Sequence, residues 1–295
     1  MLQETIEGLA IKPQGVYVDV TFGGGGHSRA ILQRMDSIGD LSFDIGHLYS
    51  FDQDKDALQN AIDDPKWTFV HSNFRYLRNW MDYYGVEHID GLLADLGVSF
   101  HHFDCPERGF SFRFSAPLDM RMNQTAKRTA ADIVNGYSEE ELAKIFFLYG
   151  ELKNGRGIAK NICKARSQKP IERTEDLVAA SRIPAEMSKE LARLFQALRI
   201  EVNDEMGALR DMLVAARDLL KPGGRIAILT YHSLEDRLVK NFLRSGNLEG
   251  PIEKDFYGNN LSPFTLIEKG REASAEEVER NPRARSAKLR VAEKR

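Results

Sequence analysis

The chain has 295 residues, of which 42% are hydrophobic and 29% are charged, and its formal net charge is −3. This composition is ordinary for a globular protein, and the length allows one large domain or a core domain with an insertion. No apolar run approaches the roughly 20 residues that a membrane span needs, and the first ten residues lack a signal-peptide pattern. The chain has only two cysteines, Cys105 and Cys163, which lie far apart in the sequence, so no disulfide framework is expected and a cytoplasmic location is.

Basic residues are concentrated in residues 153–173 and in the tail from Arg280. The first segment contains Lys153, Arg156, Lys160, Lys164, Arg166, Lys169 and Arg173 against Glu172 alone. Such segments can neutralise RNA phosphates, or they can be solvated helix faces and a charged tail. The near-neutral net charge argues against indiscriminate binding to RNA, so local basic patches matter more than the total charge.

The first hundred residues alternate between helical and strand patterns. The expected elements are a helix at 2–9, a strand at 16–22, a helix from His27, a strand at 47–51, helical spacing at 56–62, and strands at 68–70 and 89–96. Strands that alternate with helices predict a parallel α/β sheet.

The rhythm changes between Cys105 and Glu205, where helical patterns dominate and no buried strand is convincing. The α/β rhythm then resumes with a helix at 209–220, a turn at 221–224, a strand at 225–230, a helix at 234–243 and two late strands, 264–267 and 286–292, that could form a closing hairpin. The chain is therefore expected to have a core domain of residues 1–104 and 206–295. Residues 105–205 are expected to form an inserted helical domain that recognises the substrate.

Polar and glycine-rich segments follow the expected strands at Gly23–His27, Asp52, Asn73-Phe74 and Asp95. Ligands of parallel α/β sheets bind outside the carboxyl ends of the strands, so these residues predict one binding site. Gly23–Gly26 let the backbone approach a ligand closely, although a ligand-free flexible turn is the alternative. The segment lacks both the G-x-G-x-x-G/A pattern of a dinucleotide site and the Gly-Lys-Ser/Thr of a phosphate loop.

The carboxylates at these strand ends have distinct expected roles. Asp52 can accept both ribose hydroxyls of a nucleoside. Asp19, inside the first strand, can hold either the backbone of the glycine turn or a ligand amino group. For each of the three acids, including Asp95, a purely structural role is the alternative.

Seven segments make the chain resemble the bacterial 16S ribosomal RNA cytosine-N4 methyltransferases. They run in order along nearly the whole chain: 18–28 (VDVTFGGGGHS), 95–99 (DLGVS), 107–112 (ERGFSF), 117–122 (PLDMRM), 195–200 (FQALRI), 232–237 (HSLEDR) and 281–286 (NPRARS). The resemblance implies a Rossmann-like class I methyltransferase fold that binds S-adenosyl-L-methionine.

The resemblance also implies the cofactor residues, position by position: Gly25, Gly26 and His27 in the loop, Asp52 at the ribose, Phe74 at the adenine, and Asp95 after its strand. His102 stands where the family has a cofactor-contacting Gln. A His-x-Pro-Val segment common near the start of the family is absent before Leu2, which suggests a shortened or misassigned start. Residues 150–156 also depart from the commoner Gly-Glu-Glu pattern, which leaves substrate contact there open.

Asp95 and His232 are the expected catalytic residues. An amine on an aromatic base is a poor nucleophile, and the Asp95 carboxylate or the Leu96 carbonyl could hold its N–H groups. Positioning of the amine would then supply most of the rate. His232 is expected beside the substrate, with capping of the next helix by Ser233 as the alternative.

Other polar residues could have different roles. His101, His102, Asp104 and Cys105 lack a second ligand cluster, so no metal is expected. Arg108, Arg113, Arg121 and Arg199 could contact RNA or form intramolecular ion pairs.

The resemblance implies N4-methylation of a cytidine in the decoding region of 16S rRNA. The substrate is expected to be the small ribosomal subunit, with the target base splayed out of the RNA and no membrane involved. A homodimer is one candidate for the oligomeric state. The rival functions are methylation of another substrate, such as DNA or a small molecule, and a non-catalytic RNA-binding or assembly factor. Retention of Asp52, Asp95 and the glycine turn argues against the non-catalytic reading.

Overall fold

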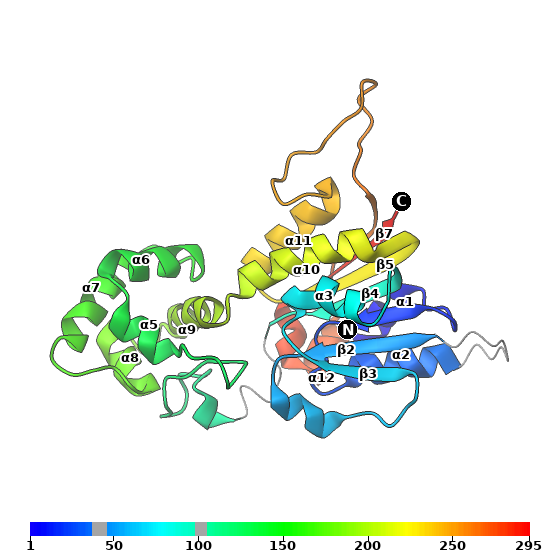
Figure 1. Cartoon of the computed structure of the whole chain (residues 1–295). Helices are drawn as coiled ribbons and strands as arrows, with labels where there is room; N and C mark the ends of the chain where they lie inside the picture. Colours follow the sequence, from blue (N-terminus) through cyan, green and yellow to red (C-terminus); the bar gives the residue numbers. More distant parts are fainter. Residues whose placement is uncertain (37–45, 98–104) are drawn as a thin grey trace. The chain divides into compact units, whose positions relative to one another are not determined.

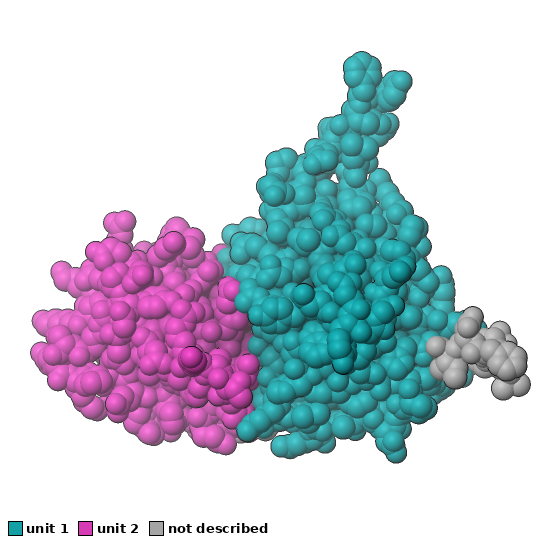
Figure 2. Space-filling view, viewed as in Figure 1, with its two compact units in different colours: residues 1–97, 206–295 teal, residues 98–205 magenta. Residues whose placement is uncertain are grey.

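The chain divides into two compact units in a computed structural model that describes residues 1–36, 46–97 and 105–295. Unit 1 contains Met1–Gly97 and Met206–Arg295, and unit 2 contains Val98–Glu205 (Figure 2). Each unit has its own hydrophobic core. Among the described residues, no helix is both long and apolar enough to cross a membrane.

Unit 1 is built on a seven-stranded sheet in the order β3-β2-β1-β4-β5-β7-β6 (Figure 1). The strands are β1 (Val16–Asp19), β2 (His47–Asp52), β3 (Trp67–His71), β4 (Ile89–Asp95), β5 (Leu220–Thr230), β6 (Phe264–Glu272) and β7 (Lys288–Lys294). Strands β1 to β5 pair in parallel, whereas β7 runs antiparallel to both β5 and β6. The mostly parallel sheet and the closing hairpin expected from the sequence are confirmed.

Helices cover both faces of this sheet. Successive strand residues point to opposite faces, so each strand packs against helices on both sides. The helices of unit 1 are α1 (Leu2–Leu9), α2 (Gly26–Asp36), α3 (Leu77–Tyr83), α10 (Glu205–Leu219), whose first residue belongs to unit 2, α11 (Ser233–Ser245) and α12 (Ala275–Arg280). Val18 and Leu92 pack in the core that contains residues of α3, α10 and α11. Their neighbours Tyr17 and Leu93 pack instead in the core that contains residues of α1 and α2.

Local hydrogen bonds move some boundaries away from the sequence expectation. β1 ends at Asp19 rather than Phe22, because the Asp19 side chain accepts the amide of Thr21 and turns the chain. The expected helix at 56–62 is a 3₁₀ helix, η1 (Lys55–Asn60), capped by Asp54. β5 begins at Leu220 and includes the expected turn, and its register with β4 shifts there.

Unit 2 is helical in its described residues. Its elements are η3 (Pro106–Arg108), α5 (Ala130–Gly136), α6 (Glu139–Leu148), α7 (Gly155–Arg166), α8 (Thr174–Ser181) and α9 (Ser188–Asn203). Capping boxes begin α5, at Thr129 and Asp132, and α6, at Ser138 and Glu141. Such boxes satisfy the free backbone amides of the first turn. The buried faces of the helices then share one core.

Replacement of Phe242 by Ala tests the packing of α11 on the sheet. Phe242 is fully buried and its ring lies 6.0 Å from that of Phe264, centroid to centroid. We expect Phe242→Ala to lower the free energy of unfolding by about 3–5 kcal/mol in urea titrations. Phe256→Ala is the matched control, because Phe256 is 98% exposed and its loss should change stability by less than about 0.5 kcal/mol. Equal effects of the two variants would contradict the packing described here.

Candidate active site

Three carboxylates lie at the carboxyl ends of adjacent parallel strands. Asp19 ends β1, Asp52 ends β2 and Asp95 ends β4, and β1 pairs with both of the other strands. The turn of Gly23–Gly26 leaves the same end of β1 and leads into α2. The structure therefore brings the glycine turn and the strand-end acids to one edge of the sheet.

The Asp19 side chain holds the glycine turn through hydrogen bonds. It is fully buried, with Oδ1 accepting the Thr21 amide at 3.0 Å and Oδ2 accepting the Ser28 hydroxyl at 2.7 Å. Burial raises the pKa of Asp19, and nearby His27 and the hydrogen bonds oppose that rise. Of the two roles expected for Asp19, these contacts correspond to holding the backbone of the turn.

The glycine turn leaves room for a ligand above its backbone. A Cβ added at Gly24 or Gly26 would meet no atom within 4 Å, and both residues are exposed. Gly25 is different, because its φ is +74° and an added Cβ would lie 2.5 Å from Nη1 of Arg29. Arg29 also donates to the Gly24 carbonyl at 2.7 Å, so the open turn is held in one shape.

Asp52 connects the end of β2 to the same turn. Its Oδ2 accepts the Gly23 amide at 2.8 Å and its Oδ1 accepts the Asp54 amide at 2.9 Å. These backbone contacts fix the orientation of the Asp52 carboxylate beside the glycine turn.

Phe74 follows β3 and begins a short 3₁₀ helix, η2 (Phe74–Tyr76). The Asn73 side chain accepts the Arg75 amide at 3.0 Å and donates to Gln53 at 2.9 Å, which ties this turn to the segment after β2. The Phe74 side chain is partly buried against the core that contains α3. A partly exposed aromatic ring near the β2 end suits a flat, apolar ligand group.

Asp95 is held by residues from three other segments. The Tyr231 hydroxyl donates to Oδ1 at 2.7 Å, Nδ1 of His27 lies 3.6 Å from Oδ2, and the Asp95 amide donates to the Thr21 hydroxyl at 2.6 Å. Burial raises the pKa of Asp95, while His27 and Tyr231 act in the opposite direction. The other ring nitrogen of His27, Nε2, is buried and lacks a hydrogen-bond partner among the described residues.

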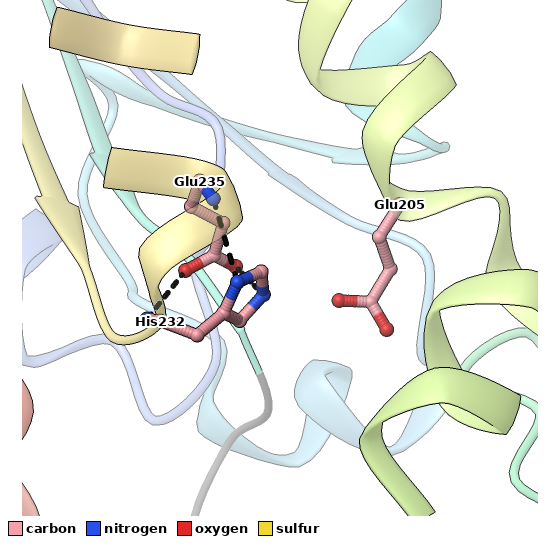
Figure 3. A group of neighbouring side chains, drawn as sticks. All are labelled: Glu205, His232 and Glu235. Atoms are coloured by element: carbon pink, nitrogen blue, oxygen red, sulfur yellow. Dashed lines mark hydrogen bonds and ion pairs between the residues drawn. The ribbon is translucent and has the colours of Figure 1, made fainter. Parts of the chain in front are cut away.

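His232 caps α11, as Figure 3 shows, so the alternative that Ser233 caps this helix is wrong. Its Nδ1 accepts the Glu235 amide at 3.4 Å, and the Glu235 carboxylate accepts the amides of Tyr231 and His232 at 3.0 and 3.4 Å. Nε2 of His232 lies 3.1 Å from Oε1 of Glu235 without hydrogen-bond geometry. The capping geometry holds the ring in place after β5.

His102, the remaining expected cofactor residue, lies outside the described residues, as do His101 and Asp104. Tyr231 and Glu235, to which the sequence patterns assign no site role, contact the other site residues. Tyr231 directly follows β5. The strand-end rule that singled out Asp52 and Asp95, applied to this fifth parallel strand, would have found it.

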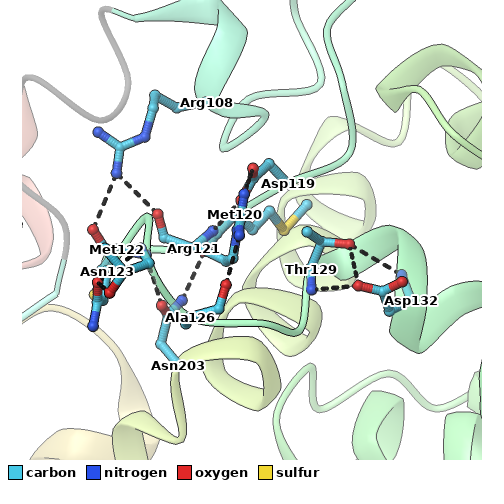
Figure 4. Close-up of polar contacts among 11 residues, drawn as sticks. Arg108, Asp119, Met120, Arg121, Met122, Asn123, Ala126, Thr129, Asp132 and Asn203 are labelled. Atoms are coloured by element: carbon cyan, nitrogen blue, oxygen red, sulfur yellow. Dashed lines mark hydrogen bonds and ion pairs between the residues drawn. The ribbon is translucent and has the colours of Figure 1, made fainter.

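Three of the four arginines weighed as RNA contacts are engaged inside unit 2. Arg121 pairs with Asp119 at 2.7 Å, and Arg108 donates to the carbonyls of Arg121 and Met122 (Figure 4). Arg199 pairs with Glu205 at 2.7 Å. These contacts give the three guanidinium groups a structural role in unit 2.

A seven-stranded sheet with one antiparallel strand, a glycine turn after β1 and an acid at the end of β2 is the architecture of a Rossmann-like class I methyltransferase. The chain belongs to the MraW methylase family, whose model matches residues 1–295.

Relatives from Phocaeicola vulgatus and Parabacteroides distasonis match the whole of this chain. It is 58% identical to Ribosomal RNA small subunit methyltransferase H of Phocaeicola vulgatus, over 100% of this chain and 96% of that protein. It is 59% identical to the protein of the same name from Parabacteroides distasonis, with the same coverage.

Alanine substitutions at Gly25 and Gly26 should differ in their effect on stability. Gly25→Ala places a Cβ at positive φ and against Arg29, so it should cost at least about 1–2 kcal/mol. Gly26 is the first residue of α2, and a Cβ added there would meet no atom within 4 Å. Gly26→Ala should therefore leave the stability unchanged or raise it slightly. Thermal unfolding of the two variants checks this, and a larger loss for Gly26→Ala would show that the turn has another shape.

Proposed function

We propose that this protein uses S-adenosyl-L-methionine to methylate N4 of a cytidine in the decoding region of 16S rRNA. The observation that carries the proposal is the convergence of the open glycine turn, Asp52 and Asp95 at one sheet edge. The relatives named Ribosomal RNA small subunit methyltransferase H, at 58% and 59% identity, support ribosomal RNA as the substrate.

The residues at the strand ends fit the cofactor. Gly25, Gly26 and His27 would face it through the open side of the turn, and the Asp52 carboxylate would accept the ribose hydroxyls. Phe74 would contact the adenine. His102, outside the described residues, is proposed as a further contact. When bound, the cofactor supplies an electrophilic methyl group on a positively charged sulfur.

Asp95 is proposed to contact both the cofactor and the target amine. A carboxylate oriented by the Tyr231 hydroxyl, on a backbone that the Thr21 hydroxyl holds, can accept an N–H of the cytosine amine. This contact would hold the nitrogen lone pair toward the methyl group, so that positioning supplies most of the rate. The proton leaves readily after transfer, so the site needs no strong base.

His232 is proposed to lie beside the substrate base. Its ring is 10% exposed and is fixed at the start of α11 by the capping interaction with Glu235. A ring held in this way after β5 can contact a base without reorganising. Its proposed role is to orient the target base near Asp95.

Unit 2 is proposed to recognise the RNA through a basic row on α7. Arg156, Lys160 and Lys164 recur every four residues, so they share one face of the helix. All three are exposed, and none forms an ion pair with another described residue. Lys164 also lines an open hollow of about 320 Å³ bounded by residues of α7 and α8. Such a row can neutralise neighbouring phosphates.

The proposed substrate is the assembled small subunit in the cytoplasm. With a net charge of −3, long-range attraction to RNA is weak, so shape and the local row must provide selectivity. The target cytosine must leave its stack to reach Asp95, as for other enzymes that act on bases.

Asp52→Ala tests the cofactor site and the reaction together. Loss of the carboxylate removes the ribose contact, and we expect at least tenfold weaker binding of S-adenosylmethionine in calorimetry. The control is Asp63→Ala, an exposed aspartate outside the strand ends, which should bind normally.

Mass mapping of the small-subunit RNA measures the reaction of the same variants. The wild type should produce N4-methylcytidine in assembled subunits but little in naked 16S rRNA. Unmodified RNA with the wild-type protein would refute the proposed function. Equal methylation of both substrates would refute the role of the assembled particle.

The basic row is tested by the triple variant of Arg156, Lys160 and Lys164 to Ala. If each residue contacts one phosphate, the slope of log affinity against log salt should fall by about 2–3. The matched control removes three other exposed lysines of unit 2, Lys127, Lys144 and Lys189. Binding to small subunits at several salt concentrations measures both, and equal slopes would contradict the assignment.

A further inference from the structure

We propose that Tyr231 is a positioning residue that holds the Asp95 carboxylate in the one orientation in which it can accept the target amine. The proposal rests on the proposed function of Asp95. Tyr231 belongs to none of the cofactor or substrate contacts expected from the family resemblance, and it acts through Asp95 rather than on the substrate.

The Tyr231 side chain reaches Asp95 across the boundary between two paired strands. Asp95 ends β4 and Tyr231 directly follows β5, with Asp95 paired to Leu229 in register. The Tyr231 hydroxyl donates to Oδ1 at 2.7 Å. Its ring lies beside Gly97, where an added Cβ would approach Cδ2 to 3.8 Å. Tyr231 therefore binds the Asp95 side chain, and its ring lies close to Gly97.

The backbone of Tyr231 is itself anchored. Its amide donates to Oε2 of Glu235 at 3.0 Å, and Glu235 is only 3% exposed. The same carboxylate belongs to the capping box that fixes His232. One buried acid of α11 thus places both the residue that holds Asp95 and the histidine proposed beside the base.

An aspartate side chain can rotate about its last torsion, so an unrestrained carboxylate would present either oxygen to the substrate. The hydrogen bond from Tyr231 uses Oδ1 and leaves Oδ2 on the side of His27. The Asp95 backbone is fixed separately by the Thr21 hydroxyl. Together these contacts define the position and the rotation of the acceptor, which is what a reaction driven by positioning requires.

The same hydrogen bond affects protonation. Burial raises the pKa of Asp95, Glu235 adds to the rise, and His27, Tyr231 and the Met1 amino group lower it. Asp19 lies close enough that the charge of Asp95 raises the pKa of Asp19. Burial and Asp95 raise the pKa of the Tyr231 phenol, so its hydroxyl stays a donor throughout the working pH range. Removing that donor should raise the pKa of Asp95 further, so that the ionised acceptor forms only at a higher pH than in the wild type.

Tyr231→Phe tests the proposal, with Tyr17→Phe as the matched control. Tyr17 is a buried tyrosine whose hydroxyl accepts the Lys12 amide away from the strand ends. We expect Tyr231→Phe to lower kcat about 10- to 100-fold at neutral pH, the range for losing a hydrogen bond to a charged group. KM for S-adenosylmethionine should change little, and kcat should recover partly as the pH rises. Tyr17→Phe should alter only thermal stability.

The outcomes separate this inference from the proposed function. Asp95→Asn, assayed in the same experiment, should lose methyl transfer to small subunits. If Asp95→Asn stays fully active, the proposed role of Asp95 fails. If Asp95→Asn is inactive but Tyr231→Phe keeps the wild-type kcat and pH profile, only the positioning role fails. A kcat loss in Tyr231→Phe that is equal at all pH values and accompanied by reduced thermal stability would also overturn it.

Discussion

The rest of the site depends on the hydrogen bonds of the buried Asp19 carboxyl group. It binds the amide of Thr21 at the start of the turn and the hydroxyl of Ser28 in α2. The Thr21 hydroxyl in turn accepts the amide of Asp95. Because burying a carboxyl group is costly unless it is hydrogen-bonded, these contacts lock the glycine turn, α2 and the end of β4 into one arrangement.

The acids at the neighbouring strand ends build on that arrangement in different ways. Asp52 is oriented by backbone amides, which hold its carboxylate beside the turn. Asp95 is oriented by the side chain of Tyr231 and is 31% exposed, so it can meet a substrate. The parallel sheet brings them together since β1, which lies between β2 and β4, places both acids at one edge. The fold at this edge and the chemistry proposed for it therefore depend on the same few hydrogen bonds.

Much of this arrangement could be predicted from the sequence, because strand ends in a parallel α/β pattern define the ligand edge. The strands expected at 47–51 and 89–96 lie at His47–Asp52 and Ile89–Asp95, each within one residue of the prediction, and each ends in an acid. Contacts between distant segments could not be predicted, since periodicity says nothing about which side chains meet. The bond of Tyr231 to Asp95 joins residues 136 positions apart. Likewise His232, not Ser233, caps α11, because the chain enters the helix one residue earlier than expected.

A crystal structure of the protein grown with S-adenosylhomocysteine tests the central claim most directly. The strand ends should hold the nucleoside over Gly23–Gly26, with its ribose hydroxyls within hydrogen-bond distance of the Asp52 carboxylate. Its sulfur should lie on the side of Asp95. A structure in which the ligand binds elsewhere, or in which side chains fill the space above Gly24 and Gly26, would contradict the assignment of this edge as the active site.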